Sequence, residues 1–235
     1  MAPTEPFAWL LWQFGYSICH QMGDRSLFVD GHQYPIDARM SGIFLGFLIT
    51  SLYLLLMDRW RRPKLPDRIV MVFAVGGALA MMLDVVTSYS GMRPTTNLIR
   101  LATGFAMGAA VGLLFPAVWR LVMAGGKPFV GRGVPVSTWR DLPVVYGLIF
   151  VTGAAVYTTR TGLGFYYLIA ASMIVAYILL FHLAIRLLVK SILVPRLGWL
   201  ATNRKQIAVA VFLQGATTFA LWAAHLAADR AMGMA

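Results

Sequence analysis

The chain alternates between long apolar runs and short polar connections. Six of the runs have about the 17 or more residues that a helix needs to cross the hydrocarbon core of a membrane. With a shorter run at the start, the apolar segments are Phe7–Ile18, Ser41–Met57, Ile69–Thr87, Asn97–Val122, Leu142–Thr158, Leu163–Leu188 and Ile207–Ala227. The pattern predicts an all-α fold, a polytopic transmembrane helical bundle of about seven transmembrane helices.

The first run, Phe7–Ile18, is short for a complete crossing. We expect it to span the membrane by lengthening toward Ala2 or into the polar residues that follow it. A re-entrant or interfacial helix is the alternative. No Lys or Arg precedes the run, whereas a secretory signal peptide begins with a basic segment, so we expect no cleavable signal.

Composition favours a membrane protein over a soluble one. Of the 235 residues, 59% are hydrophobic and only 12% are charged, and the mean hydropathy is +0.72. Soluble domains carry about 25% charged residues. The single cysteine excludes a disulfide within the chain and says nothing about the redox compartment.

The net charge of +11 comes from cations that gather in short loops. The loops Arg59–Arg68, Arg120–Arg140 and Arg186–Lys205 hold five, four and five of the 20 Lys and Arg residues. Basic loops face the cytoplasm. We therefore predict a cytoplasmic N-terminus, membrane lipids as partners, and no role in binding nucleic acid.

The most polar stretch is Cys19–Ser41, CHQMGDRSLFVDGHQYPIDARMS, which we call the polar segment. It lies between two apolar runs. In the seven-helix topology it faces outward, on the same side as the Ser88–Thr96 turn. Thr95 or Thr96 is expected to cap the helix that follows this turn.

Two ionisable residues fall inside apolar runs near this outer side, Asp84 and Arg100. Asn97, Arg100 and Thr103 are spaced by three residues and therefore share a helix face. We expect an Asp84–Arg100 or an Asp84–Arg39 ion pair, because pairing lowers the cost of burying each charge. The pair is either a clasp between helices or part of a substrate or cofactor pocket, since intramembrane charges are often functional.

Glycines at four-residue steps mark two helix faces. Gly42 and Gly46 lie on one predicted span, and Gly104, Gly108 and Gly112 lie on another. Small residues at this spacing let helix backbones approach closely. We expect the second face to pack within the chain and keep a homodimer seam as the alternative.

Four motifs occur in order: CHQ-x-x-x-RS from Cys19, G-x-Q-x-P-x-x-A-R-x-x-G from Gly31, D-x-x-T from Asp84, and T-N-x-x-R-x-x-T-G from Thr96. Together they resemble the membrane protein family called domain of unknown function 2085, over about Tyr16–Leu114. The resemblance implies a multi-pass protein of a bacterial or archaeal cell membrane but no activity. It divides the chain into a family-like membrane domain, 1–122, with the outward polar segment, and three further helices of the same bundle, 123–235.

The resemblance also implies a ligand set that this chain has partly lost. Family members read C-x-R-C after the proline, giving three cysteines beside the histidine of CHQ, whereas this chain has Asp37 and Met40 at those positions. The metal candidates that remain are Cys19, His20, Asp37 and Met40, with His32 nearby. Such a set suits zinc or copper. The alternative is a scaffold that has lost an ancestral site.

Two further histidines lie in the last two apolar runs, His182 and His225. Axial haem ligation is one interpretation, and hydrogen bonding within the bundle is the one we prefer.

Three functions follow from these observations. The first is a non-catalytic small subunit or assembly partner of a larger membrane complex. The second is a membrane enzyme or metal-handling protein with an outward pocket for a lipid-like or anionic substrate, built from Cys19, His20, Asp37, Arg39, Asp84, Asn97 and Arg100. There, Arg39 and Arg100 would bind an anionic head group and Asp84 or His20 would move protons. A transporter is the third and is less favoured, since the two halves show no internal repeat.

Overall fold

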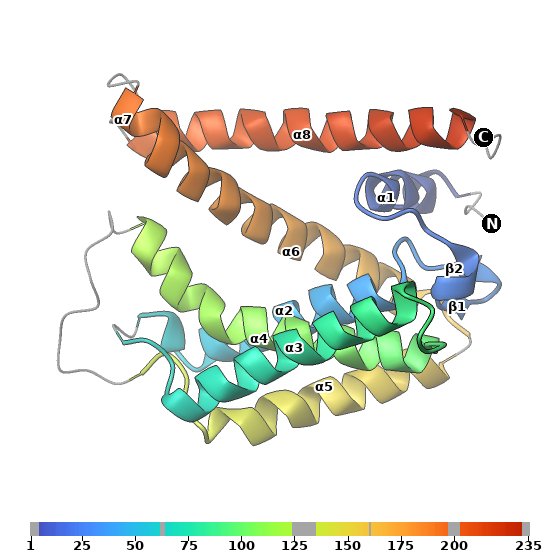
Figure 1. Ribbon diagram of the computed structural model, residues 1–235, viewed down its shortest axis with the longest axis horizontal. Helices are drawn as coiled ribbons and strands as arrows, with labels where there is room; N and C mark the ends of the chain where they lie inside the picture. Colours follow the sequence, from blue (N-terminus) through green and yellow to red (C-terminus); the bar gives the residue numbers. More distant parts are fainter. Residues whose placement is uncertain (1–4, 62–63, 124–134, 160, 197–202, 232–235) are drawn as a thin grey trace.

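The computed structural model describes residues 5–61, 64–123, 135–159, 161–196 and 203–231. Long helices run along the length of the molecule (Figure 1). They are α2 Ala38–Leu56, α3 Arg68–Tyr89, α4 Asn97–Met123, α5 Asp141–Thr158, α6 Gly164–Leu188 and α8 Asn203–Ala231.

The shorter elements lie at the ends of these helices. The polar segment contains the 3₁₀ turn η1 Gly23–Arg25 and a small antiparallel hairpin of β1 Phe28–Val29 and β2 His32–Gln33, in which Phe28 pairs with Gln33. The remaining elements are helix α1 Pro6–Tyr16, the 3₁₀ turn η2 Arg59–Arg61, the π-helical turn η3 Val189–Leu193 and the short helix α7 Val194–Arg196.

Six helices in the described part of the chain are long and apolar enough to cross a membrane: α2, α3, α4, α5, α6 and α8. The predicted all-α transmembrane bundle is confirmed. One detail differs, because the first run forms α1, which has only 11 residues. At about 1.5 Å per residue, α1 is too short to span the hydrocarbon core. The expected full crossing of Phe7–Ile18 is therefore wrong, and its alternative, a re-entrant or interfacial helix, fits this length.

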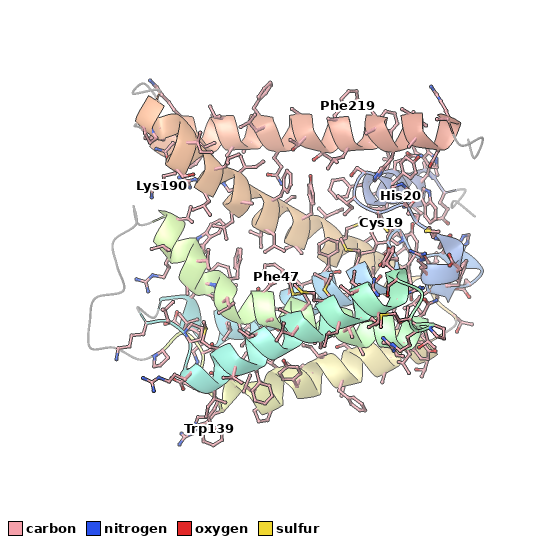
Figure 2. All side chains as sticks on the ribbon, viewed as in Figure 1. Cys19, His20, Phe47, Trp139, Lys190 and Phe219 are labelled. Atoms are coloured by element: carbon pink, nitrogen blue, oxygen red, sulfur yellow. The ribbon has the colours of Figure 1, made fainter. Side chains whose placement is uncertain are left out.

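The six spans give the molecule two different ends. The hairpin end holds α1, β1 and β2, the end of α3 and the start of α4, and α8 also finishes there (Figure 1). We call the opposite end of the molecule the basic end. Figure 2 shows Lys190 and Trp139 there, far from Cys19 and His20. The basic loop Arg120–Arg140 lies largely outside the described residues. The sequence placed the N-terminus and the basic loops on the same side, whereas the described N-terminal residues lie at the hairpin end, opposite the basic end. Which of the two ends faces the cytoplasm stays a prediction.

The centre of the bundle is the contact between α2 and α4, where glycines remove the side chains that would separate the helices. A Cβ atom at Gly108 would lie 2.2 Å from the Ile43 carbonyl oxygen, and one at Gly104 would lie 2.2 Å from that of Arg39. Gly42 faces the Leu101 carbonyl in the same way. The predicted packing of these glycines within the chain is confirmed.

Helix α8 lies at the edge of the bundle and packs mainly against α6, α1 and η3. Polar contacts hold it there. The Thr218 hydroxyl lies 2.7 Å from that of Tyr177 on α6, and Trp222 Nε1 donates to Gln13 Oε1 of α1 at 3.1 Å. Helix α8 is thus attached along one side only.

Candidate functional site

The polar segment folds back on itself around a tight turn. Asp30 and Gly31 connect β1 to β2 with positive φ values of 48° and 74°, as a two-residue hairpin turn requires. An Asp-Gly pair between two short strands is a strong hairpin signal in a sequence, so this turn could have been predicted from residues 30 and 31. The Asp30 carboxylate then accepts a hydrogen bond from the Gly162 backbone N–H at 2.6 Å, which ties the turn to the start of α6.

Two glutamines fix the rest of the segment. Gln21 Nε2 donates to the carbonyl oxygens of Trp12 and Pro35, at 2.8 and 2.7 Å. Gln33 Nε2 donates to the Gln21 carbonyl and to the Ser26 hydroxyl, at 2.5 and 2.9 Å. Both glutamines are buried. They therefore serve the backbone of this segment and of α1 rather than an external ligand.

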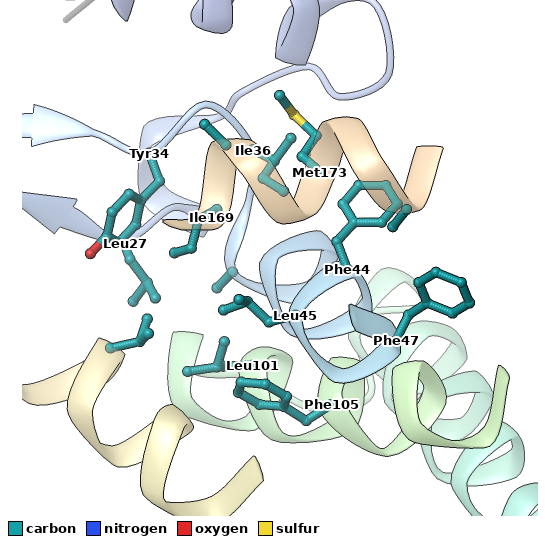
Figure 3. Close-up of a cluster of buried hydrophobic side chains, with 14 of the residues drawn as sticks. Leu27, Tyr34, Ile36, Phe44, Leu45, Phe47, Leu101, Phe105, Ile169 and Met173 are labelled. Carbon is teal, nitrogen blue, oxygen red and sulfur yellow. The ribbon is translucent and has the colours of Figure 1, made fainter. Parts of the chain in front are cut away.

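Apolar side chains of the same segment anchor it to the bundle. Leu27, Tyr34 and Ile36 are buried and join the core cluster that includes Leu101 of α4 and Ile169 of α6 (Figure 3). The polar segment is therefore a folded cap on the hairpin end of the helices.

Asp84 is the centre of the candidate site, and its side chain is only 2% exposed. Arg39 of α2 forms an ion pair with Oδ2. Arg93 Nη2 and the Thr95 hydroxyl donate to Oδ1 at 2.7 and 2.9 Å. The Thr103 hydroxyl lies 3.3 Å from Oδ2 and shares its one hydrogen with a backbone carbonyl of α4. Each carboxylate oxygen thus has two neighbouring donors, which is about the number that an ionised carboxylate accepts.

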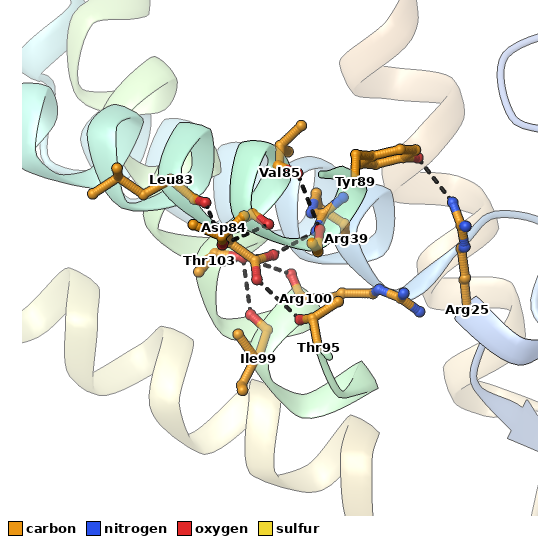
Figure 4. Close-up of polar contacts among 12 residues, drawn as sticks. Arg25, Arg39, Leu83, Asp84, Val85, Tyr89, Thr95, Ile99, Arg100 and Thr103 are labelled. Atoms are coloured by element: carbon orange, nitrogen blue, oxygen red, sulfur yellow. Dashed lines mark hydrogen bonds and ion pairs between the residues drawn. The ribbon is translucent and has the colours of Figure 1, made fainter. Parts of the chain in front are cut away.

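Of the two predicted ion pairs, Asp84–Arg39 is confirmed and Asp84–Arg100 is wrong (Figure 4). Arg100 Nη1 instead donates to Asn97 Oδ1 at 3.1 Å. Arg93 is a further partner that the sequence pattern does not indicate. It lies outside the apolar runs, in the turn after α3, and only the fold of that turn shows that its side chain returns to Asp84.

Asn97 connects α4 to the polar segment. Its Nδ2 donates to the Ser26 carbonyl at 3.0 Å and lies 3.4 Å from the Asp24 carbonyl, while its Oδ1 accepts from Arg100. Arg25 lies between those two carbonyls in sequence. The cap of α4 comes from Thr96, whose hydroxyl accepts from the Ile99 N–H at 3.3 Å, in agreement with the predicted capping.

The four metal candidates are spread over different surroundings. Cys19 is buried, and burial together with the negative charge of Asp37 raises the pKa of its thiol to about 11. Asp37 caps α2 by accepting a hydrogen bond from the Met40 N–H at 2.7 Å. His20 is exposed. The described residues contain no group of three or more His, Cys, Asp or Glu residues that could hold a metal ion.

The histidine rings of His20 and His225 lie with their centroids 4.3 Å apart, between the polar segment and α8. His225 Nδ1 lies 2.6 Å from the Tyr16 carbonyl oxygen, and the Tyr16 hydroxyl donates to Asp229. Burial, and to a lesser extent this bond, raise the pKa of Tyr16 to about 12. His182 lines a cavity of about 670 Å³ between α1, α6 and α8.

The fold and this network define a polytopic membrane protein whose polar residues form a cap at one end of the bundle. Residues 19–114 match the model of a family described as predicted membrane protein (DUF2085), and this match confirms the resemblance over that part of the chain.

Two archaeal relatives are similar over the same half of the chain. An uncharacterized protein of Methanocaldococcus jannaschii is 33% identical over 94 residues, which are 40% of this chain and 58% of that protein. An uncharacterized protein of Methanothermobacter thermautotrophicus is 26% identical over 106 residues, which are 45% of this chain and 91% of the relative. The chain thus spans less than two thirds of the first relative. No solved structure matches the chain.

Proposed function

We propose that this protein is a non-catalytic integral membrane protein that acts as a small subunit or assembly partner of a larger membrane complex. The observation that carries this proposal is the set of donors around Asp84. A general base needs a free lone pair that faces its substrate. In Asp84 both oxygens are occupied by donors of the protein itself.

The other polar motif residues are used in the same way. Gln21, Gln33 and Asn97 hydrogen bond to backbone carbonyls of the chain, and Asp37 caps a helix. A site for chemistry would leave some of these groups free for a substrate. The arrangement favours a scaffold whose polar groups hold its own fold.

Helix α8 is the surface that we assign to a partner. Only 6% of its most apolar 18-residue stretch is buried, compared with 61% for α4. On the side away from α6, exposed alanines follow one another at four-residue steps, Ala216, Ala220 and Ala224. Such steps let a second transmembrane helix approach closely. The partner that fits is a transmembrane helix of another membrane protein.

Purification of the tagged protein from its native membrane in a gentle detergent, followed by mass spectrometry, tests this proposal. We expect a membrane protein to co-migrate in stoichiometric amount. Ala220→Leu should remove that protein from the complex, because its side chain would fill the space between the helices. Gly147→Leu on α5 is the matched control: this glycine is also exposed, and a Cβ added there meets no atom within 4 Å.

The proposal fails if the wild-type protein migrates alone. It also fails if Ala220→Leu and Gly147→Leu retain the same companion, since α8 would then not be the surface that binds it.

A further inference from the structure

Arginines outnumber acidic groups around the Asp84 cluster. Arg25, Arg39 and Arg100 lie at this end of α3 and α4 (Figure 4), and Arg93 binds Asp84 there. The carboxylates that pair with these four arginines among the described residues are Asp84 and Asp24. Four cations against two anions leave an excess of two positive charges in this cluster. Arg39 and Arg93 both bind the single carboxylate of Asp84, so one excess charge lies at that carboxylate and the other at Arg100.

Arg25 and Arg100 are the two of these arginines that do not bind Asp84. Arg100 hydrogen bonds to the neutral Asn97 amide. Arg25 donates to the Tyr89 hydroxyl at 2.9 Å and lies 5.0 Å above the centre of that ring. The carboxylate oxygen nearest to Arg25 belongs to Asp24 and lies 3.7 Å from Arg25 Nε, beyond hydrogen-bond distance. The Asp24 side chain is 69% exposed. Within the described part of the chain, the buried Arg25 Nε has no hydrogen-bond partner.

Asn97 holds the two arginines together. It binds the backbone carbonyls on both sides of Arg25 through Nδ2, and it binds the Arg100 guanidinium through Oδ1. Figure 4 shows the Arg100 side chain extending toward Arg25. Asn97 thus fixes the Arg100 guanidinium and the backbone on either side of Arg25 at the start of α4, and an anion bound by both arginines would offset their charge.

We propose that Arg25 and Arg100, positioned by Asn97, form a binding site for a phosphate-bearing anion, with Arg93 at its rim. A guanidinium presents several N–H donors in a planar fork that matches phosphate oxygens. The Arg93 side chain is 42% exposed, and Tyr89 is exposed at the end of α3, the level at which tyrosines meet lipid head groups. The anion is therefore either a phospholipid head group or a free phosphate compound.

This inference does not depend on the proposed function. A subunit that binds lipid at its surface and a protein that migrates alone would both keep the site, and a protein without the site could still bind a partner through α8.

The test uses the full-length protein in a non-ionic detergent. Native mass spectrometry measures its binding of phosphatidylglycerol, with digalactosyl diacylglycerol as the phosphate-free lipid. In a second arm, melting temperatures are compared in inorganic phosphate and in chloride at equal ionic strength. The variants are Arg25→Gln and Arg100→Gln. The matched control is Arg230→Gln, an exposed arginine at the same end of the molecule but in α8.

We expect the wild type and Arg230→Gln to bind phosphatidylglycerol in preference to the galactolipid. Arg25→Gln and Arg100→Gln should each bind it about ten-fold more weakly, which corresponds to about 1.4 kcal/mol. Arg100→Lys keeps the charge but loses the planar fork, so its binding of phosphatidylglycerol should lie between that of the wild type and that of Arg100→Gln. It also provides a variant that folds if Arg100→Gln does not.

A rise in melting temperature with inorganic phosphate alone, lost in the same two variants, would support the site and identify a free phosphate compound as its ligand. Equal binding of the two lipids with no effect of phosphate would overturn the proposal. So would an equal loss of binding in Arg230→Gln, which would indicate attraction by net charge only.

Discussion

The Arg39 guanidinium of α2 and the Asp84 carboxylate of α3 form an ion pair in which the aspartate side chain is 2% and the arginine side chain 10% exposed. Arg93 supplies a second charged contact to the same carboxylate at 2.7 Å. Removing two charges from water costs several kcal/mol per ion, and good geometry with further hydrogen bonds must offset that cost. Thr95 and Thr103 provide such bonds, so the pair joins α2, α3 and the start of α4.

The glycine contact between α2 and α4 predicts a strong effect of one methyl group. In Gly108→Ala the new Cβ would lie 2.2 Å from the Ile43 carbonyl oxygen. Because that oxygen belongs to the backbone of α2, the two helices must move apart to relieve the contact. Overpacking of this kind costs about 1–3 kcal/mol or more. The melting temperature in detergent should fall clearly.

Gly76→Ala is the control for that experiment, because a Cβ there meets no atom within 4 Å. Alanine is the better helix former, so this variant should melt at the same temperature or slightly higher. Equal melting of Gly108→Ala and wild type would show that the two helices do not pack at these glycines.

Cys19 should react slowly with maleimide in the folded protein at pH 7 to 8. Burial, and then the charge of Asp37, raise its pKa from 9.0 to about 11, and the thiolate is the reactive form. The rate should rise with pH toward 11, while denatured protein should react at once. Rapid labelling at pH 7 would contradict the burial of this thiol.

The same shift predicts a loss of stability at high pH. Between pH 9 and pH 11 the unfolded thiol ionises while the folded thiol keeps its proton. The contribution of Cys19 to stability is therefore complete below about pH 9 and falls as the pH rises toward 11. Melting curves of wild type and Cys19→Ser across this range should converge as the pH increases.

The six-span topology predicts which residues face the same side. In a Cys19→Ser background, Glu5→Cys and Arg230→Cys should both react with an impermeant maleimide on intact cells. Arg204→Cys, at the other end of α8, should react only after permeabilisation. Labelling of Glu5→Cys only in permeabilised cells would mean that the first apolar run crosses the membrane.

The long spans could be predicted from the sequence because length and hydropathy determine them locally. The start of α4 at Asn97 and the end of α5 at Thr158 lie where the pattern places them. The close packing of α2 and of α4 at their glycines was also predictable, because small residues at four-residue steps let helix backbones approach. Only the structure shows that these two faces pack against each other. The need to neutralise a buried charge predicted that Asp84 would pair with Arg39 or Arg100, and the structure selects Arg39.

The rest depends on contacts between distant segments. Arg93 reaches Asp84 only because the turn after α3 folds back, and Arg100 turns to Asn97 because the polar segment offers its carbonyls to that amide. The contact between the rings of His20 and His225 joins residues 205 positions apart. Helix α1 was predicted wrongly because a 12-residue run suits either a shortened span or a surface helix.

A double-mutant cycle at Arg39 and Asp84 tests most directly whether this cluster is structural. Asp84→Asn leaves two arginines without their counter-charge, and Arg39→Gln leaves the buried carboxylate with Arg93 as its charged partner. Breaking a buried pair from one side costs about 3–5 kcal/mol. We predict that each single variant lowers the melting temperature and the amount of folded protein, and that the double variant loses much less than the sum of the two. A structural clasp would be contradicted if Asp84→Asn gave normal amounts of stable protein and if the effects of the two single variants on melting temperature simply added in the double variant. Asp84 would then return to the candidates for catalysis.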